Sequence, residues 1–251
     1  MLKVDLNSDI GEGFGDWTKG DDAALMEVIS SANIACGFHA GDPDVMARTM
    51  RLALENGVGI GAHPGFNDLK GFGRRRIPMS HDELANMVTY QLGAAQAMAR
   101  AAGGEVRHLK LHGALSNMCS EDADMARACY EAALKVQPDV VIMVLAATAM
   151  EDVVRDLGCN WAGEIFADRA YNDDGTLVAR GQPGAVLHDP EAITARILEM
   201  LKAGAIITES GKHIPCRIDT ICLHGDTQGA VDMARALRRG LEAEGVEIAG
   251  L

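Results

Sequence analysis

Residues 106–112 read Val-Arg-His-Leu-Lys-Leu-His. Successive side chains of a β-strand point to opposite faces, so His108, Lys110 and His112 share one face and the two leucines share the other. The apolar face is suited to packing under helices. The polar face then has to point into an enclosed interior, which a barrel of strands provides.

Short β-type runs alternate with amphipathic helical patterns along the whole chain. The predicted strands are Leu2–Leu6, Asn33–Cys36, Val58–Ala62, Val106–Leu111, Val140–Leu145, Trp161–Phe166 and Thr220–Leu223. The predicted helices are Asp21–Ser31, Asp44–Glu55, His81–Ala102, Asp122–Lys135, Glu191–Lys202 and Gly229–Glu244. Because alternating strands and helices imply parallel pairing, residues 1–251 are expected to form a single α/β domain.

Polar residues that can carry chemistry follow every predicted strand except the fifth. They include Asn7 and Asp9, His39, His63, Lys110 and His112, Glu164 with Asp168 and Arg169, and His224 with Asp226. An open sheet collects its site at one switch point, whereas a barrel gathers nearly all strand ends around one mouth. We therefore predict a seven-stranded β/α barrel. Gly57, Gly59 and Gly61 are expected to face inward and leave space under His63.

The composition narrows the possible partners and cellular location. The chain has 251 residues, 48% of them hydrophobic, and a formal net charge of −13. This negative field repels phosphate backbones and anionic lipid, so nucleic acid and membrane surfaces are not expected as partners. No export signal is visible, and the six cysteines show no C-x-x-C spacing. We expect reduced thiols in a cytoplasmic protein.

Two kinds of chemistry suit these residues. A metal ion could be held by Asp5 or Asp9 with His39 and His63, although Lys110 would repel a cation. Alternatively, a strand-end Asp or His activates water while Lys110 and an arginine stabilise negative charge. Lys110 could also be only the ion-pair partner of a buried carboxylate.

Six motifs occur in order along the chain. They are Asp5-Leu6-Asn7-x-Asp9; residues 33–42, Asn-Ile-Ala-Cys-Gly-Phe-His-Ala-Gly-Asp; Gly61-Ala62-His63-Pro64-Gly65 with Gly71-Phe72-Gly73-Arg74-Arg75; Lys110-x-His112-Gly113-Ala114-Leu115; Glu164-x-Phe166-Ala167-Asp168-Arg169-x-Tyr171; and Cys222-x-His224-Gly225-Asp226. Together they resemble the family of 5-oxoprolinase A subunits, also called the LamB/YcsF lactam-utilisation family. Leu111, Ser116 and Gln228 depart from the residues usual in that family.

The resemblance implies an irregular seven-stranded β/α barrel similar to glycoside hydrolase and deacetylase barrels. It also implies ATP-dependent opening of 5-oxoproline to L-glutamate, together with B and C subunits. The chain has no G-x-x-x-x-G-K-[ST] loop, so ATP is expected to be handled by the partner subunits. The three departures concern loop geometry and the pocket lining, and therefore the details of substrate choice.

The same resemblance assigns roles to residues of this chain. The catalytic set is expected to be Asp5, Asn7, Asp9, His39, Lys110 and His112, with Asp5, Asp9 or His39 as the base for water. The substrate-binding set is expected to be His63, Arg74, Arg75, Glu164, Asp168, Arg169, His224 and Asp226. Two alternatives stay open: a metal-dependent amidohydrolase or deacetylase with Asp5, His39 and His63 as ligands, and a non-catalytic binding subunit.

Overall fold

Seven parallel strands close into a barrel in the computed structural model, which describes residues 2–179, 181–223 and 229–251. The strands follow the order β1 (Lys3–Ile10), β2 (Ser31–Ala35), β3 (Gly59–His63), β4 (Val106–Lys110), β5 (Val141–Leu145), β6 (Trp161–Phe166) and β9 (Thr220–Leu223). The barrel closes between β9 and β1, where Asp5 pairs with Thr220 and Asn7 with Cys222. The predicted seven-stranded β/α barrel is confirmed.

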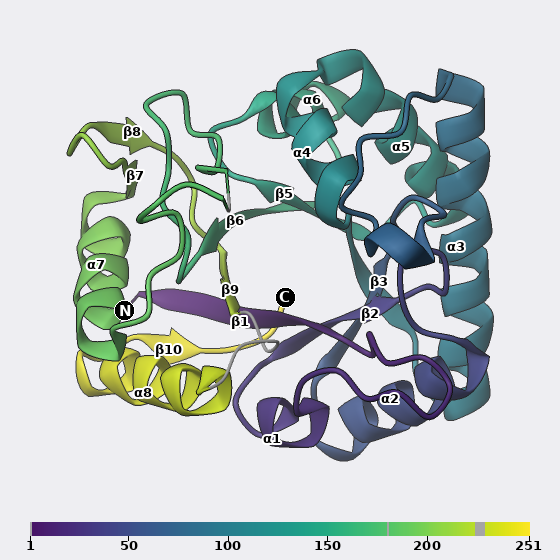
Figure 1. The fold of residues 1–251 in the computed structure, drawn as a ribbon, viewed down its shortest axis with the longest axis horizontal. Helices are drawn as coiled ribbons and strands as arrows, with labels where there is room; N and C mark the ends of the chain where they lie inside the picture. Colours follow the sequence, from purple (N-terminus) through teal and green to yellow (C-terminus); the bar gives the residue numbers. More distant parts are fainter. Residues whose placement is uncertain (1, 180, 224–228) are drawn as a thin grey trace.

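Helices surround the barrel, as Figure 1 shows in a view down its interior. They are α1 (Asp22–Met26), α2 (Pro43–Glu55), the 3₁₀ turn η1 (Leu69–Gly71), α3 (His81–Ala102), α4 (Gly113–Glu121), α5 (Ala123–Val136), α6 (Ala149–Leu157), α7 (Pro190–Ala203) and α8 (Ala230–Ala243). Outward-facing strand residues such as Leu6, Ile34 and Leu109 are fully buried. Each such side chain stabilises the fold by about 1.5–3 kcal/mol. In the described residues, no helix has the length and apolarity needed to cross a membrane.

Several elements differ from the predicted ones. β1 continues to Ile10, four residues beyond the predicted end, because its inward polar side chains find partners inside the barrel. The first helix ends at Met26 instead of Ser31, since residues 31–35 extend to pair with both β1 and β3. Helices α4 and α6 were not predicted, because nine residues are too few to show a clear period.

Three short strands also escaped prediction. β7 (Ala205–Ile207) and β8 (His213–Pro215) form an antiparallel pair beside the barrel, and β10 (Glu247–Ile248) adds to the start of β1. Between β6 and α7, the chain runs through a long irregular segment. Two isolated β-bridges pair residues within this segment. This segment supplies part of the wall of the cavity described below.

The expected space under His63 is absent. A Cβ atom added to Gly61 would collide with the ring of His108, so the side chain of His108 occupies the room that the glycine leaves. Gly57 lies before β3 in a left-handed turn with φ +69°. The glycine at position 61 therefore accommodates a buried histidine from the neighbouring strand, and the prediction of open space was wrong.

Candidate active site

Asp5 lies inside the barrel near the beginning of its strand. Its Oδ1 accepts hydrogen bonds from Ser30 Oγ at 2.6 Å and Ser31 Oγ at 2.8 Å, and its Oδ2 accepts one from Thr220 Oγ1 at 2.5 Å. Burial raises the pKa of Asp5 although these hydroxyl groups oppose the change. Three hydroxyl donors of the barrel thus satisfy this carboxyl group, which connects β1 to β2 and β9.

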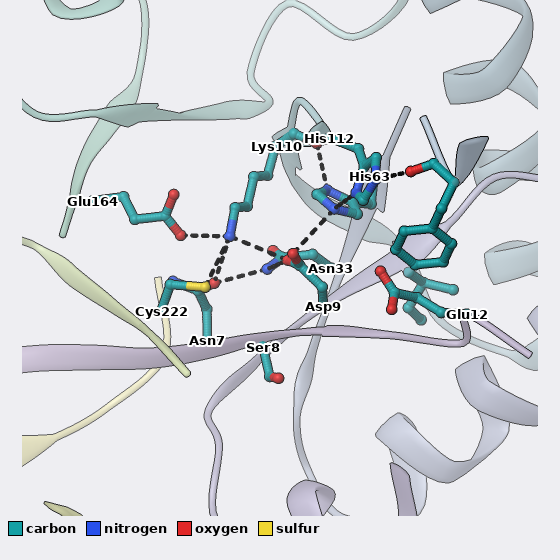
Figure 2. A network of polar contacts seen from close by, with 12 residues as sticks. Asn7, Ser8, Asp9, Glu12, Asn33, His63, Lys110, His112, Glu164 and Cys222 are labelled. Atoms are coloured by element: carbon teal, nitrogen blue, oxygen red, sulfur yellow. Dashed lines mark hydrogen bonds and ion pairs between the residues drawn. The ribbon is translucent and has the colours of Figure 1, made fainter. Parts of the chain in front are cut away.

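Lys110 occupies the next level of the barrel interior. Its ammonium lies 2.7 Å from Glu164 Oε1, 3.1 Å from Asp9 Oδ1, 3.3 Å from Asn7 Oδ1 and 3.1 Å from Cys222 Sγ (Figure 2). Burial alone would lower the pKa of Lys110, but Asp9 and the neighbouring acidic groups hold it well above its usual value. The ammonium is therefore a permanent positive charge shared between two carboxylates.

Three histidines lie above this level. His63 Nδ1 contacts Lys110 O at 2.8 Å, and His63 Nε2 lies 3.0 Å from His112 Nδ1 and 3.4 Å from Asp9 Oδ2. His112 Nε2 contacts Phe72 O at 2.9 Å. His39 stacks on His112 with ring centroids 3.7 Å apart, and neither of its nitrogens has a hydrogen-bond partner among the described residues. Burial lowers the pKa of His39 well below its usual value, so this ring is neutral.

These layers open into a cavity of about 370 Å³ at the C-terminal ends of the strands. This volume suits a small organic ligand. Its polar wall includes Asp9, Glu12, Asp22, Lys19, Arg74, Lys110, Arg169, His63, His112, Ser116 and Asn117, and its apolar wall includes Leu25, Leu111, Leu145, Phe166, Leu177 and Val178. The cavity thus combines four cationic side chains with three carboxyl groups.

The environments of Asp9 and Glu12 push their pKa values in opposite directions. Burial alone would raise the pKa of Asp9, but the charges on His63 and Lys110 hold it well below its usual value. Burial and the charge on Asp9 raise the pKa of Glu12, although Lys19 opposes this at 2.9 Å. Two nearby carboxyl groups whose pKa values are shifted in opposite directions are suited to different roles in acid–base chemistry.

The structure separates the residues named from the sequence into distinct groups. Asp9, His63, Arg74, Lys110, His112 and Arg169 line the cavity. Asn7, His39 and Glu164 support its wall through contacts with these residues. Asp5, Arg75 and the buried Asp168 are not part of the lining, and Arg75 forms an ion pair with Asp68. His224 and Asp226, like Gln228, lie outside the described residues.

The sequence analysis missed Glu12 and Lys19. Both lie in the irregular segment between β1 and α1, where no strand or helix period indicates which side chains turn inward. Lys19 Nζ bonds Glu12 and also lies 3.3 Å from the centre of the Phe72 ring. The one available signal was the nearness of Glu12 to Asp9 in the Asp5-x-Asn7-x-Asp9 pattern.

The side chains that come closest to a metal-ligand set differ from the predicted one. Among the described residues, donor atoms of Glu12, His39, His63 and His112 lie within 4.8 Å of one another, and Asp5 is not included. Metal–imidazole bonds of about 2.0–2.1 Å lie in the ring plane. Because the His39 and His112 rings are stacked and only 7° from parallel, one ion cannot lie in both planes. These four residues, as arranged, do not fit a single metal ion.

Comparison with known proteins supports the family resemblance that the sequence motifs indicate. The sequence model of the LamB/YcsF family matches residues 4–251. The chain belongs to the LamB/YcsF family. Among relatives, this LamB/YcsF protein is 67% identical over 248 residues to the 5-oxoprolinase A subunit of Ruegeria pomeroyi, a match that covers 99% of this chain and 98% of the relative.

Solved structures give the same picture for this LamB/YcsF chain. The crystal structure of the lactam utilization protein from Thermus thermophilus matches with a TM-score of 0.93 and 40% identity, covering 100% of both chains. A T48 deacetylase matches with a TM-score of 0.51 and 15% identity, covering 99% of this chain and 88% of the deacetylase. The second similarity concerns the barrel fold alone.

Proposed function

We propose that this chain is the A subunit of a cytoplasmic, ATP-dependent 5-oxoprolinase, which opens the ring of 5-oxoproline to L-glutamate together with B and C subunits. The observation that carries the proposal is one cavity in which Asp9 and Glu12, with oppositely shifted pKa values, lie beside lysine and arginine side chains. The names of the relatives supply the substrate and the class of complex.

A lactam is a stable amide and a poor electrophile. Phosphorylation of its oxygen by ATP, in the partner subunits, would convert it into a good one. The activated ring carries a carboxylate and a phosphate, and cations of the cavity wall such as Arg74 and Lys19 are placed to bind these anions. Water then adds to the ring carbon, the carbon–nitrogen bond breaks, and the ring nitrogen leaves as an amine, which gives an acyl phosphate. A second water cleaves this acyl phosphate into the side-chain carboxylate of glutamate and inorganic phosphate.

Glu12 is the carboxylate best suited to take the proton from water. A base works most effectively when its pKa approaches the working pH, and the pKa of Glu12 is raised whereas that of Asp9 is lowered. Asp9 instead stays ionised and balances Lys110 and His63. Of the three bases expected from the sequence, Asp5 is enclosed by hydroxyl groups and His39 is outside the cavity lining.

The test measures glutamate release from 5-oxoproline and ATP, first with this chain alone and then with co-expressed B and C subunits. We expect turnover with the partners only, and no micromolar ATP binding by the isolated chain in calorimetry. Absence of glutamate from an assembled complex would contradict the proposed function.

Variants of the complex then test the base. We expect Glu12→Gln to lower turnover by about 10²–10⁴-fold, and the exposed Glu199→Gln to leave it unchanged. Assembly is checked by size-exclusion chromatography in both cases. A Glu12→Gln complex with normal turnover would remove Glu12 from the mechanism, and normal turnover in variants of both Glu12 and Asp9 would favour a non-catalytic binding role.

A further inference from the structure

The hydrogen bonds of His63 and His112 determine which of their ring nitrogens carry a hydrogen. A backbone carbonyl accepts but cannot donate, so His63 Nδ1 must carry a hydrogen to bond Lys110 O, and His112 Nε2 must carry one to bond Phe72 O. A neutral imidazole has only one N–H. If both rings were neutral, His63 Nε2 and His112 Nδ1 would point lone pairs at each other across 3.0 Å.

We propose that His63 and His112 form an imidazolium–imidazole pair, which holds one proton more than two neutral rings and shares it between His63 Nε2 and His112 Nδ1. The extra proton turns two facing lone pairs into a charge-assisted hydrogen bond. All four ring nitrogens then have a partner, as buried polar groups require. This assignment needs no metal ion between the rings.

The charges around the pair favour a proton on His63. Asp9 Oδ2 lies 3.4 Å from His63 Nε2, and the pair is also faced by Glu12, His39, Lys19, Lys110 and Arg74. Burial, together with the charge on His63, lowers the pKa of His112 to about 3. His112 is therefore the neutral acceptor, and the ionised Asp9 balances the positive charge of His63.

This proton gives the pair a chemical role, which rests on the proposed function. Both rings line the cavity, so a bound ring lies against the pair, and the hydrogen bond between His63 and His112 opens when the proton passes to it. When the carbon–nitrogen bond breaks, its electron pair stays on nitrogen and nitrogen takes the proton from the pair. The proton that water loses to Glu12 then returns to the pair, which balances the cycle. His63 and His112 together are thus the catalytic acid.

The protonation state can be measured on the isolated wild-type chain without any substrate. Long-range ¹H–¹⁵N spectra of ¹⁵N-histidine-labelled protein at pH 7–8 should show both nitrogens of His63 protonated and His112 protonated only at Nε2. Two neutral rings would overturn the proposal, as would one equivalent of a transition metal in protein purified without chelator. A protonated pair in a chain whose complex lacks oxoprolinase activity would contradict the proposed function alone.

Kinetics in the complex separate a catalytic from a structural role. His63→Asn and His112→Asn should each lower kcat/KM by about 10²–10⁴-fold, whereas the matched change at the exposed His81, H81N, should have no effect. The wild-type profile should fall at alkaline pH as the pair loses its proton, and this limb should be missing or shifted in the two variants. Unchanged alkaline limbs in folded variants would show that the pair is not the acid.

Discussion

Lys110 Nζ lies 2.7 Å from Glu164 Oε1, and both side chains are buried inside the barrel. Removing the ammonium leaves Glu164 and Asp9 without their shared counter-charge. We therefore expect Lys110→Met to lower the free energy of unfolding by about 3–5 kcal/mol. The double variant K110M/E164Q should recover much of this stability, as measured by urea denaturation, because a neutral amide replaces one of the two carboxylates that lost their counter-charge.

Turnover should behave differently from stability in the same two variants. If Lys110 stabilises charge that develops on the substrate, turnover per folded molecule should fall by about 10²–10³-fold in both, including the restabilised one. Glutamate release by the assembled complex gives this value. A Lys110→Met protein that melts far lower yet keeps near-normal turnover would leave Lys110 with a purely structural role.

Neighbouring arginines should respond in opposite ways to substitution. Arg74 lines the cavity, so Arg74→Ala should raise the KM for 5-oxoproline about 10- to 100-fold, as expected for one charged hydrogen bond of about 1.5–3 kcal/mol. Arg75 pairs with the buried carboxylate of Asp68, so Arg75→Ala should lower the Tm and leave the KM unchanged. Equal KM effects of the two variants would contradict this division.

The protonation of Asp22 makes the free energy of unfolding depend on pH in the mildly acidic range. Burial raises the pKa of Asp22 to about 6, and its Oδ2 accepts a hydrogen bond from Gly11 N. Because the folded-state pKa lies above the unfolded one, its stabilising contribution is complete below about pH 4 and is lost as pH rises through about 6. Asp22→Asn should therefore be more stable than wild type by about 1–3 kcal/mol at pH 7.

The measurement is urea unfolding of both proteins from pH 4 to pH 8. The difference between them should grow between pH 4 and pH 6 and stay constant above that. A constant difference across the whole range would show that Asp22 titrates normally in the folded state.

Gly61 and His108 should behave as a complementary pair. Gly61→Ala places a Cβ against the His108 ring and should destabilise the protein by about 1–3 kcal/mol, or more where the ring cannot move. His108→Ala removes the ring, so the double variant should be less destabilised than the sum of the two single ones. Thermal and urea unfolding of all four proteins measure this coupling, and strict additivity would argue against it.

The barrel could be predicted because alternation along a strand is visible in the sequence. Polar residues at 108 and 110 beside apolar ones at 109 and 111 assign an inward and an outward face. Alternation does not show how far along the barrel an inward-facing side chain lies. Asp5 and Asp9 share one face of β1, but four residues of strand separate them by roughly 13 Å, so one binds hydroxyls and the other lines the cavity.

The parts of the site outside strands were less accessible from sequence. Arg74 and Arg75 are adjacent and chemically alike, and only the position of Asp68 after folding sets them apart. Glu12 and Lys19 belong to a loop whose path depends on tertiary contacts such as that of Lys19 with Phe72. Local patterns carry no information on such distant partners.

The closure of the barrel between β1 and β9 also sets an order of events during synthesis. Asn7 donates to Thr220, and Ser8 donates to the backbone of Leu223, across more than 200 residues of chain. The first strand of the barrel therefore lacks these hydrogen-bond partners until its last strand, β9, has left the ribosome. Pairing over such a distance is slow to form, so newly made chains expose an open sheet edge for longer than helical bundles of this length, and need protection from aggregation in that interval.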